Sequence, residues 1–431
     1  MSKPLFALMG LLGVGLCEIN EVRAGIPIER PNLELDWSRA AVTDVAQWQS
    51  FFDQKYPLMD PVMDITKGNE SGRFAWEAPA WIRSYLALYQ TTRDMQYLEK
   101  AVNLAQHMAL YTDEARHRRG EIDVVEKGYW QAPKYYLNNR GNPVPGWRGY
   151  SKGWRVQVLQ DGRILSAILR VVDRIKQEQV SEYLAVADEL LALAERVIES
   201  HDTSFSHTKT PRVAGSYYYP HVRNRYTNDN GLFSKPLPFN HNMAMAEALL
   251  LAHKWMPEKQ DYWDKAELLT QFFADHMQIR EDGSCFWRYA FVPRDPNSKA
   301  EDITHADIEI GFLVIAQEMQ LADVSPMLDC MAQTLVVTMY DDGEISYKVD
   351  GTGVAKGYHQ MYVASHWLEL AGREPRIAEI AFELLNRLES PPSSFNGFLG
   401  WAQLLALQDS QRQAFLVQNQ PVTDEGPNRP D

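Results

Sequence analysis

The sequence predicts an all-α fold, an (α/α)6 toroid in which helical hairpins close into a ring, with a few short strands in the loops. Apolar residues recur at helical spacing over most of the chain after Thr43. Short connections such as Arg93-Asp94 join many of these segments in pairs. One member of each pair opens with polar or aromatic residues and continues with small or apolar ones, whereas its partner carries more charge. We expect the first kind to form an inner ring and the second an outer ring.

The periodicity predicts helices over residues 43–57, 72–92, 95–112, 160–176, 182–200, 239–255, 262–278, 303–320, 324–340, 358–371, 375–390 and 394–408. The inner helices are expected to begin near Ser71, Gln160, Asn240, His305, Tyr358 and Phe395. Their N-terminal ends then face one mouth of the ring, where their polar residues converge. Residues 284–292 and 344–349 alternate in the manner of short strands.

The first 24 residues have the pattern of a secretory signal peptide. Lys3 precedes an apolar run from Leu5 to Leu16, and Val22-Arg23-Ala24 resembles a cleavage site. A lipoprotein anchored at Cys17 is the less favoured alternative, because bulky Leu16 precedes it. We therefore expect a periplasmic or secreted protein, with residues 25–411 as a single toroid domain and 412–431 as a flexible tail.

The chain is acidic, with 43 Lys and Arg against 57 Asp and Glu and a net charge of −14. Removal of residues 1–24 leaves this charge unchanged, because Lys3 and Arg23 leave with Glu18 and Glu21. The balance argues against a nucleic acid or an anionic membrane as partner. An acidic ligand must therefore meet a local basic cluster.

Beyond the signal peptide only Cys285 and Cys330 remain, so the chain is not a disulfide scaffold. We expect two buried thiols, although an oxidising compartment would allow one bridge between them.

The segment Phe239-Asn240-His241-Asn242 opens a predicted helix and is the strongest candidate site. Unpaired N–H groups and the positive end of the helix dipole attract anions to such an end. The Asn240 amide can donate to a carboxylate, and the His241 imidazole can donate or accept a proton near neutral pH. Simple helix capping is an equally weighted alternative for Asn240.

Two further segments offer cations and phenols. Trp287-Arg288-Tyr289 lies in the strand-like stretch, and Arg225-Tyr226 lies in the loop before the Asn240 helix. Trp287 could stack on a sugar ring, and either tyrosine could transfer a proton. An ordinary strand with an outward Arg288 and a packed Tyr289 is the alternative.

The remaining candidates lie at other predicted helix starts. His305 and Glu309 are spaced to share one helical face. A His–Glu pair that supports the site, or a glycosidase carboxylate, fits them better than a metal site, because no HExxH or paired-cysteine spacing is present. The rest of the substrate-binding set consists of Tyr358, His359, Asp161, Arg163 and Glu77. We expect no metal and no cofactor.

The run Asn240-His241-Asn242-Met243-Ala244-Met245-Ala246, with Arg288 further along, resembles the Asn-His and Arg elements of toroidal alginate lyases and related glucuronan lyases. The resemblance implies β-elimination on a uronic-acid polymer. It places Asn240, His241 and Arg288 at the substrate carboxylate and the catalytic proton, with a tyrosine as acid or acid/base. In those lyases the tyrosine falls several residues beyond the arginine, where this chain has Asp295 and Pro296. Tyr289 or Tyr226 takes that role by inference.

The chemistry of the residues agrees with this implication. The C5 proton of a uronate is weakly acidic until its carboxylate charge is neutralised by amide, imidazole or guanidinium donors. A phenol or imidazole must then take that proton, and an acid must protonate the departing O4. Tyr289, Tyr226 and His305 are the available groups.

Two other functions fit the same fold. A glycoside hydrolase would use paired carboxylates from Glu77, Asp161, Asp307 and Glu309. A non-catalytic glycan-binding protein would use the aromatic residues without turnover. We rank the polysaccharide lyase first, because the strongest cluster contains amide, imidazole, guanidinium and phenol groups rather than two carboxylates.

Overall fold

The computed structural model describes residues 35–56, 68–69, 71–121, 145–150, 154–210, 213–218, 235–291 and 299–418, and the statements below refer to these. The predicted signal peptide, Arg225, Tyr226 and residues 419–431 lie outside the described residues. None of the helices described is both long enough and apolar enough to cross a membrane.

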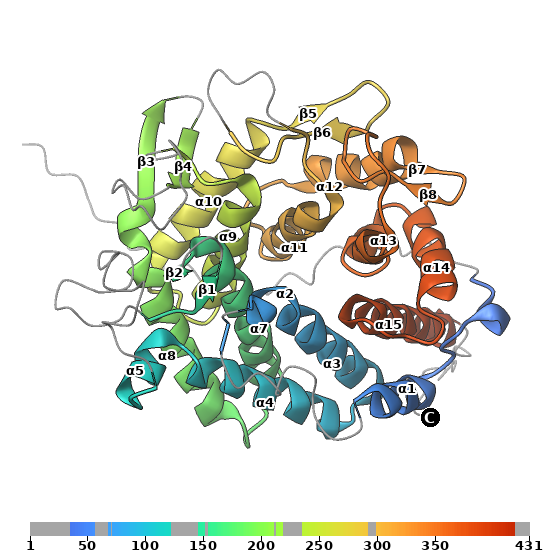
Figure 1. The fold of residues 1–431 in the computed structure, drawn as a ribbon, viewed down its shortest axis with the longest axis horizontal. Helices are drawn as coiled ribbons and strands as arrows, with labels where there is room; N and C mark the ends of the chain where they lie inside the picture. Colours follow the sequence, from blue (N-terminus) through green and yellow to red (C-terminus); the bar gives the residue numbers. More distant parts are fainter. Residues whose placement is uncertain are drawn as a thin grey trace, which may run out of the picture.

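Parallel helices form the inner ring of the molecule. In chain order they are α3 (Ala78–Thr92), α7 (Val158–Gln177), α9 (Phe239–His253), α11 (Ile303–Glu318), α13 (Gly357–Val363) and α15 (Phe395–Gln418). Figure 1 shows them around a common axis, with α15 packed beside α3 so that the ring closes. The fold is thus the α/α toroid that the sequence predicts, and each inner helix is one that the sequence assigned to the inner ring.

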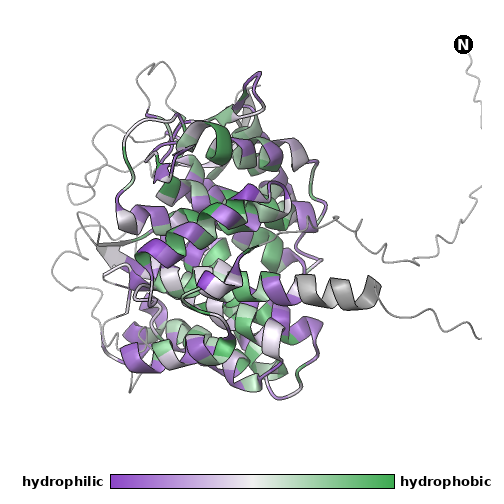
Figure 2. Cartoon of the chain, turned by 90° about the vertical axis from the view of Figure 1, so that its right-hand side faces the viewer, coloured by the Kyte–Doolittle hydropathy of each residue, from purple (hydrophilic) through white to green (hydrophobic). Residues whose placement is uncertain are grey.

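The outer helices pack against the inner ring from outside (Figure 1). They are α1 (Val45–Lys55), α4 (Met95–Leu110), α8 (Leu184–Ser200), α10 (Gln260–Ala274), α12 (Ser325–Gln333) and α14 (Arg376–Leu388). Polar and apolar residues alternate along the helices in the side view of Figure 2, as expected when one face is solvated. Inner α9 instead buries nearly all of its side chains, because other helices surround it.

Several predicted helices are interrupted or longer than expected. The predicted 72–92 helix begins with a separate turn, α2 (Arg73–Trp76). The 324–340 helix ends in a π-helical segment, Thr334–Met339, and the 358–371 helix continues as a 3-10 segment, Trp367–Gly372. Helix α15 continues to Gln418, into the segment that the sequence analysis assigns to a flexible tail. A short helix, α5 (Asp113–Arg118), follows α4.

A glycine lets two inner helices approach closely. A Cβ atom at Gly162 of α7 would lie 2.6 Å from the carbonyl carbon of Ala244 in α9, so no side chain fits between the two backbones. The contact fixes the first turns of α7 against α9. Arg163, the next residue, is thereby held inside the ring, where it is buried.

The strands form two-stranded antiparallel hairpins in the loops. They pair β1 (Arg148–Tyr150) with β2 (Trp154–Val156), β3 (Phe205–Thr210) with β4 (Val213–Tyr217), β5 (Gln278–Ile279) with β6 (Cys285–Phe286), and β7 (Tyr340–Asp341) with β8 (Glu344–Ile345). Both strand-like segments predicted from the sequence contain a strand, β6 and β8, although each strand is shorter than predicted.

Cys285 of β6 and Cys330 of α12 form a disulfide, with their Cα atoms 5.3 Å apart. The expectation of two buried thiols is therefore wrong. The hairpin of β5 and β6 packs on α12 and brings together two residues whose proximity no local pattern indicates.

Candidate functional site

The inner helices all begin at the same end of the ring, which we call the mouth. Arg163, in the second turn of α7, donates from Nε to the carbonyl oxygen of Ala75, 2.7 Å away at the entry to α3. The N–H of Phe239, at the start of α9, donates to the carbonyl oxygen of Tyr289 at 3.2 Å. Asn396, at the start of α15, contacts His366, which follows α13. The predicted convergence of polar helix starts is therefore present among the described residues.

Asn240 is fully buried in the first turn of α9. Neither its amide oxygen nor its amide nitrogen has a hydrogen-bond partner among the described residues. The residue that precedes the helix is Pro238, so Asn240 is not the helix cap. Buried amides are nearly always paired, and an unpaired one calls for an explanation such as a ligand or an ordered water. The neighbouring His241 is half-buried.

Asn242, two residues along, shows the opposite arrangement. Its side-chain oxygen accepts from the backbone N–H of Tyr217 at 2.8 Å, and its nitrogen donates to the carbonyl oxygen of Leu237 at 2.9 Å. Asn242 therefore ties the preceding loop to α9, whereas the Asn240 amide has no such bond among the described residues.

The extended segment after β6 runs antiparallel to the segment that leads into α11. The N–H of Tyr289 donates to Lys299 at 3.1 Å, and the N–H of Glu301 donates to Trp287 at 3.2 Å. Alternation along this segment places Trp287 and Tyr289 on one face and Arg288 on the other. Trp287 is fully buried, and its indole N–H donates to Glu309 Oε2 at 2.5 Å. Trp287 therefore belongs to the core and does not form the sugar-stacking surface that we expected.

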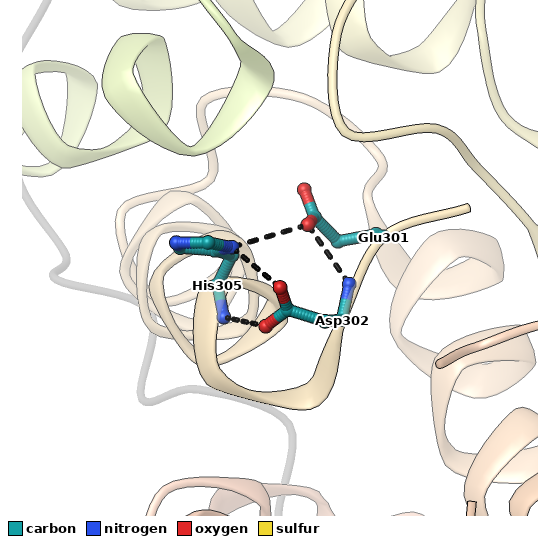
Figure 3. A group of neighbouring side chains, drawn as sticks. All are labelled: Glu301, Asp302 and His305. Atoms are coloured by element: carbon teal, nitrogen blue, oxygen red, sulfur yellow. Dashed lines mark hydrogen bonds and ion pairs between the residues drawn. The ribbon is translucent and has the colours of Figure 1, made fainter. Parts of the chain in front are cut away.

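His305 lies between two carboxylates at the start of α11 (Figure 3). Its Nδ1 atom is 2.9 Å from Asp302 Oδ2 and 3.6 Å from Glu301 Oε1. Burial disfavours the charged imidazole, but the ion pairs outweigh it and raise the pKa of His305 to about 10. Burial also opposes ionisation of Asp302, yet the pairing with His305 lowers the pKa of that carboxyl to about 2. His305 is thus an imidazolium at neutral pH and cannot act as the base that the sequence left open for it.

Asp302 also explains why the helix starts there. Its Oδ1 atom caps α11 by accepting from the N–H groups of Thr304 at 2.9 Å and His305 at 3.2 Å. The same carboxylate thus fixes both the helix end and the imidazolium.

Aromatic rings enclose His305. The ring centroids of Tyr289 and His305 lie 5.2 Å apart, and those of Trp76 and His305 lie 6.4 Å apart. The Arg163 guanidinium lies over the Trp76 ring, 4.9 Å from its centroid. Trp76 is only partly buried and is therefore available to a ligand at the mouth.

Behind His305 lie two fully buried glutamates, Glu301 and Glu309. Burial raises the pKa of Glu301, and the charge of His305 opposes this shift. Burial, and then the charge of Glu301, raises the pKa of Glu309 well above its ordinary value. Its surroundings therefore favour the protonated form of Glu309 over the ionised form.

A second polar cluster lies deeper in the ring. Asp307 Oδ2 is 3.4 Å from Arg163 Nη1 and 3.1 Å from His366 Nδ1, and Arg83 Nη1 is 2.8 Å from the same nitrogen. Burial raises the pKa of Asp307 to about 6, partly offset by Arg163 and Arg83. Burial, together with the two arginines, lowers the pKa of His366 well below its ordinary value. Asp307 can therefore exchange a proton in the range where His366 stays neutral.

A cavity of about 30 Å³ lies within this cluster, lined in part by Arg83, Arg163, Arg170, Glu247, Asp307 and His366. Such a volume holds a water molecule or two but not a sugar ring.

Other predicted residues have partners of their own. Asp161, in the first turn of α7, is buried, accepts from the N–H of Trp147 at 2.9 Å and pairs with His201 at 2.8 Å, so it joins the start of α7 to the end of α8. Glu77 pairs with Arg73 at 3.1 Å. Tyr358, at the start of α13, is 64% exposed, and its ring lies tilted against that of His359 with the centroids 3.9 Å apart.

The sequence analysis did not select several residues that the structure places in the two clusters. They are Arg83, Glu301, Asp302, Tyr362, His366 and Asn396. The spacing of Asp302 and His305, three residues apart at a helix start, was a readable signal. His366 and Arg83 gave no such signal, because their partners are distant in the sequence.

Glu301, Asp302 and His305 have ligand atoms within 4.8 Å of one another, close enough for a metal ion. The imidazole already pairs with both carboxylates, however. We describe these residues as an ion-pair group and assign no metal to them.

No family model and no curated protein matches the chain. Among solved structures, a polysaccharide lyase is 12% identical over 86% of this chain and 98% of its own, with a TM-score of 0.46. The GH76A α-1,6-mannanase from Salegentibacter sp. HEL1_6 is 13% identical over 87% and 100%, with a TM-score of 0.47. A possible member of the GH105 family from Salmonella enterica serovar Paratyphi A is 11% identical over 86% and 94%, with a TM-score of 0.47. At this level the similarities transfer no activity, substrate or residue role to this chain.

Proposed function

We propose that this protein is a polysaccharide lyase that cleaves a uronic-acid polymer of the alginate or glucuronan type by β-elimination. The observation that carries the proposal is the Asn240 amide, which is buried and has no hydrogen-bond partner among the described residues. Asn240 lies at the start of α9, where the N–H of Phe239 donates to the carbonyl oxygen of Tyr289. The ring of Tyr289 lies beside the His305 imidazolium. An amide donor, a helix N-terminus and an imidazole N–H together suit a carboxylate whose charge must be stabilised.

In the proposed reaction, Asn240 and His305 hold the uronate carboxylate and stabilise the negative charge that develops when C5 loses its proton. His241 or Tyr289 takes that proton, and a phenol or imidazolium at the mouth gives one to the departing O4. Trp76 offers a face for a sugar ring. Arg288 remains a predicted carboxylate ligand, although strand alternation turns it away from the face that carries Tyr289.

A glycoside hydrolase is the second candidate, and one observation favours it. The pKa of Asp307, raised to about 6 by burial, suits a general acid, and its Oδ1 atom has no hydrogen-bond partner among the described residues. Asp161 no longer supports that candidate, because His201 and Trp147 occupy its carboxylate.

The deciding experiment incubates the purified protein with alginate, glucuronan and glycosaminoglycans. A lyase produces ultraviolet absorbance from the conjugated double bond at each cut, in step with new chain ends. A hydrolase produces reducing ends without that absorbance, and a glycan-binding protein shows saturable binding with neither signal. Either of the last two results would reject the lyase.

We also propose that the protein is exported to the periplasm or secreted. The N-terminal signal pattern motivates this, and the disulfide is compatible with an oxidising compartment. The proposed partner is an acidic polysaccharide. Because the protein as a whole is acidic, local basic side chains must bind it. Fractionation of cells that express the full chain tests the location.

A further inference from the structure

Three rings lie in contact at the mouth, where α13 begins. The ring centroids of Tyr347 and His359 lie 4.6 Å apart, and those of His359 and Tyr358 lie 3.9 Å apart. Tyr358 is 64% exposed, and Tyr347 and His359 are half-buried. The three rings therefore form a continuous aromatic surface that is most exposed at Tyr358, and we call it the α13 platform.

The backbone joins the α13 platform to the start of α11. The N–H of Ile303 donates to the carbonyl oxygen of Tyr347 at 3.1 Å, and Asp302 and Lys348 form an antiparallel bridge. The side chain of Asp302 in turn pairs with His305 at 2.9 Å (Figure 3). Helix α13 also packs against α11 in the ring (Figure 1). The α13 platform is thus continuous with the candidate site.

Two lysines flank the α13 platform. Lys348 follows Tyr347 in the chain. Lys356 precedes α13, and its carbonyl oxygen accepts from the N–H of His359 at 2.8 Å. Neither ammonium group forms an ion pair with a carboxylate of the described residues. Both charges are therefore available to a ligand.

The other ionisable groups of this segment do not cancel the two lysines. Burial lowers the pKa of His359; the charge of Asp302 opposes the shift and that of Lys356 adds to it. The imidazole is thus mostly neutral near pH 7. Residues 346–359 then contain two lysines and one aspartate, Asp350, which gives a net charge of +1 in a chain whose net charge is −14. Asp350 also has a partner of its own, because it accepts from the N–H of Thr352 at 3.0 Å.

This combination suits one class of ligand. An aromatic face can stack on the C–H face of a sugar ring, and an ammonium group can pair with a carboxylate. A neutral glycan would use only the rings. The local excess of positive charge in an acidic protein favours an acidic saccharide.

We propose that the α13 platform, together with Lys348 and Lys356, is a second saccharide-binding site, which holds a uronate residue of a polymer whose cleaved bond lies near Tyr289 and His305. The identity of the polymer rests on the proposed function. Tyr358 and Lys356 touch the chain in this proposal but take no part in bond cleavage. The affinity for an oligosaccharide should therefore increase with its length until it spans both sites.

The test measures the binding of uronate oligosaccharides of increasing length by calorimetry. Carboxyl-reduced oligosaccharides of the same lengths serve as the neutral comparison. The parent protein is the full chain with Tyr289→Phe, in which we expect little cleavage, and the wild type is assayed for cleavage in parallel. Circular dichroism and thermal unfolding check that each variant is folded.

The variants separate the rings from the charges. Tyr358→Ala removes the exposed ring, and Tyr358→Phe keeps it. The double variant Lys348→Ala/Lys356→Ala removes both charges. Lys254→Ala/Lys259→Ala is the matched control, because both lysines follow α9 at the end opposite the mouth, where they pair with Asp173 and Glu199.

Tyr358→Ala should weaken the binding of the longer oligosaccharides by about threefold to tenfold, acidic and reduced alike, and Tyr358→Phe should restore it. The variant that lacks Lys348 and Lys356 should weaken the binding of acidic oligosaccharides alone, by about twofold to tenfold, and by less at high salt. Both losses should grow with the length of the oligosaccharide. The control should bind as the parent does.

Equal affinity of the parent and all variants at every length would overturn the inference, and cleavage by the wild type would then leave the proposed lyase standing. A loss of the same size at every length would overturn it as well, because Tyr358 would then act through the fold or at the cleaved bond. Length-dependent losses without any cleavage by the wild type would support the second site and reject the lyase. A parent and a wild type that bind none of the acidic oligosaccharides would overturn both.

Discussion

The phenol ring of Tyr289 lies 5.2 Å from the imidazole ring of His305, centroid to centroid. The first residue follows β6 and the second begins an inner helix, and backbone hydrogen bonds between Tyr289 and Lys299 hold the two segments together. A phenol and a paired imidazole thus lie side by side at the mouth of the toroid. The predictions below test what each contributes.

Tyr289→Phe should nearly abolish elimination and leave polymer affinity within a few-fold of wild type, because the ring can still pack against His305. Steady-state kinetics and a binding measurement on the same polymer separate the two effects. Tyr340→Phe is the control, because Tyr340 hydrogen-bonds Glu383 on the outer helix α14. Equal activity of the Tyr289 variant and the control would remove Tyr289 from the reaction.

Asn240→Ala and His241→Ala should each lower turnover by about 10²-fold or more, because the loss of a catalytic donor costs that much. Asn240→Ala should also leave the melting temperature nearly unchanged, because its amide has no hydrogen-bond partner among the described residues. Asn242→Ala should do the reverse: it breaks hydrogen bonds to Tyr217 and Leu237 and should destabilise the fold by roughly 1–3 kcal/mol. Thermal unfolding and initial rates on the three variants check this contrast. A strongly destabilised Asn240→Ala would mean that its amide is structural.

The ion-pair group at His305 should make stability depend on pH in a defined direction. The folded-state pKa of His305, about 10, lies above its ordinary value of 6.5, so its contribution is complete below about pH 6.5 and is lost as the pH rises towards 10. The difference in free energy of unfolding between wild type and His305→Gln should therefore shrink across that window. Urea unfolding at several pH values measures it, and a difference that grew with pH would contradict the assignment of charge.

The disulfide should stabilise the part of the chain that carries the site. The bridge joins residues 45 positions apart, and Tyr289 and His305 both lie between them. Replacing both cysteines with serine should lower the free energy of unfolding by roughly 2–4 kcal/mol. Urea unfolding of wild type under oxidising and reducing conditions is the control, since reduction should reproduce the loss. Identical midpoints in all of these samples would show that the bridge does not form in solution.

The sequence by itself determined the helices, their pairing and their inner or outer position. These follow from local properties: apolar residues at helical spacing define a buried face, and a charged partner helix must face solvent. The starts of the inner helices near Asn240 and His305 were predictable for the same reason, because the change from polar to apolar residues lies within a single turn.

The tertiary structure alone decided which polar side chains meet. Local spacing places a residue on a helix face but does not say which distant segment packs against that face. Asp161 thus pairs with His201, the indole of Trp287 donates to Glu309, and Cys285 forms a disulfide with Cys330. The pKa shifts of His305 and Glu309 depend on burial and on these neighbours, and both are properties of the packed ring rather than of any stretch of sequence.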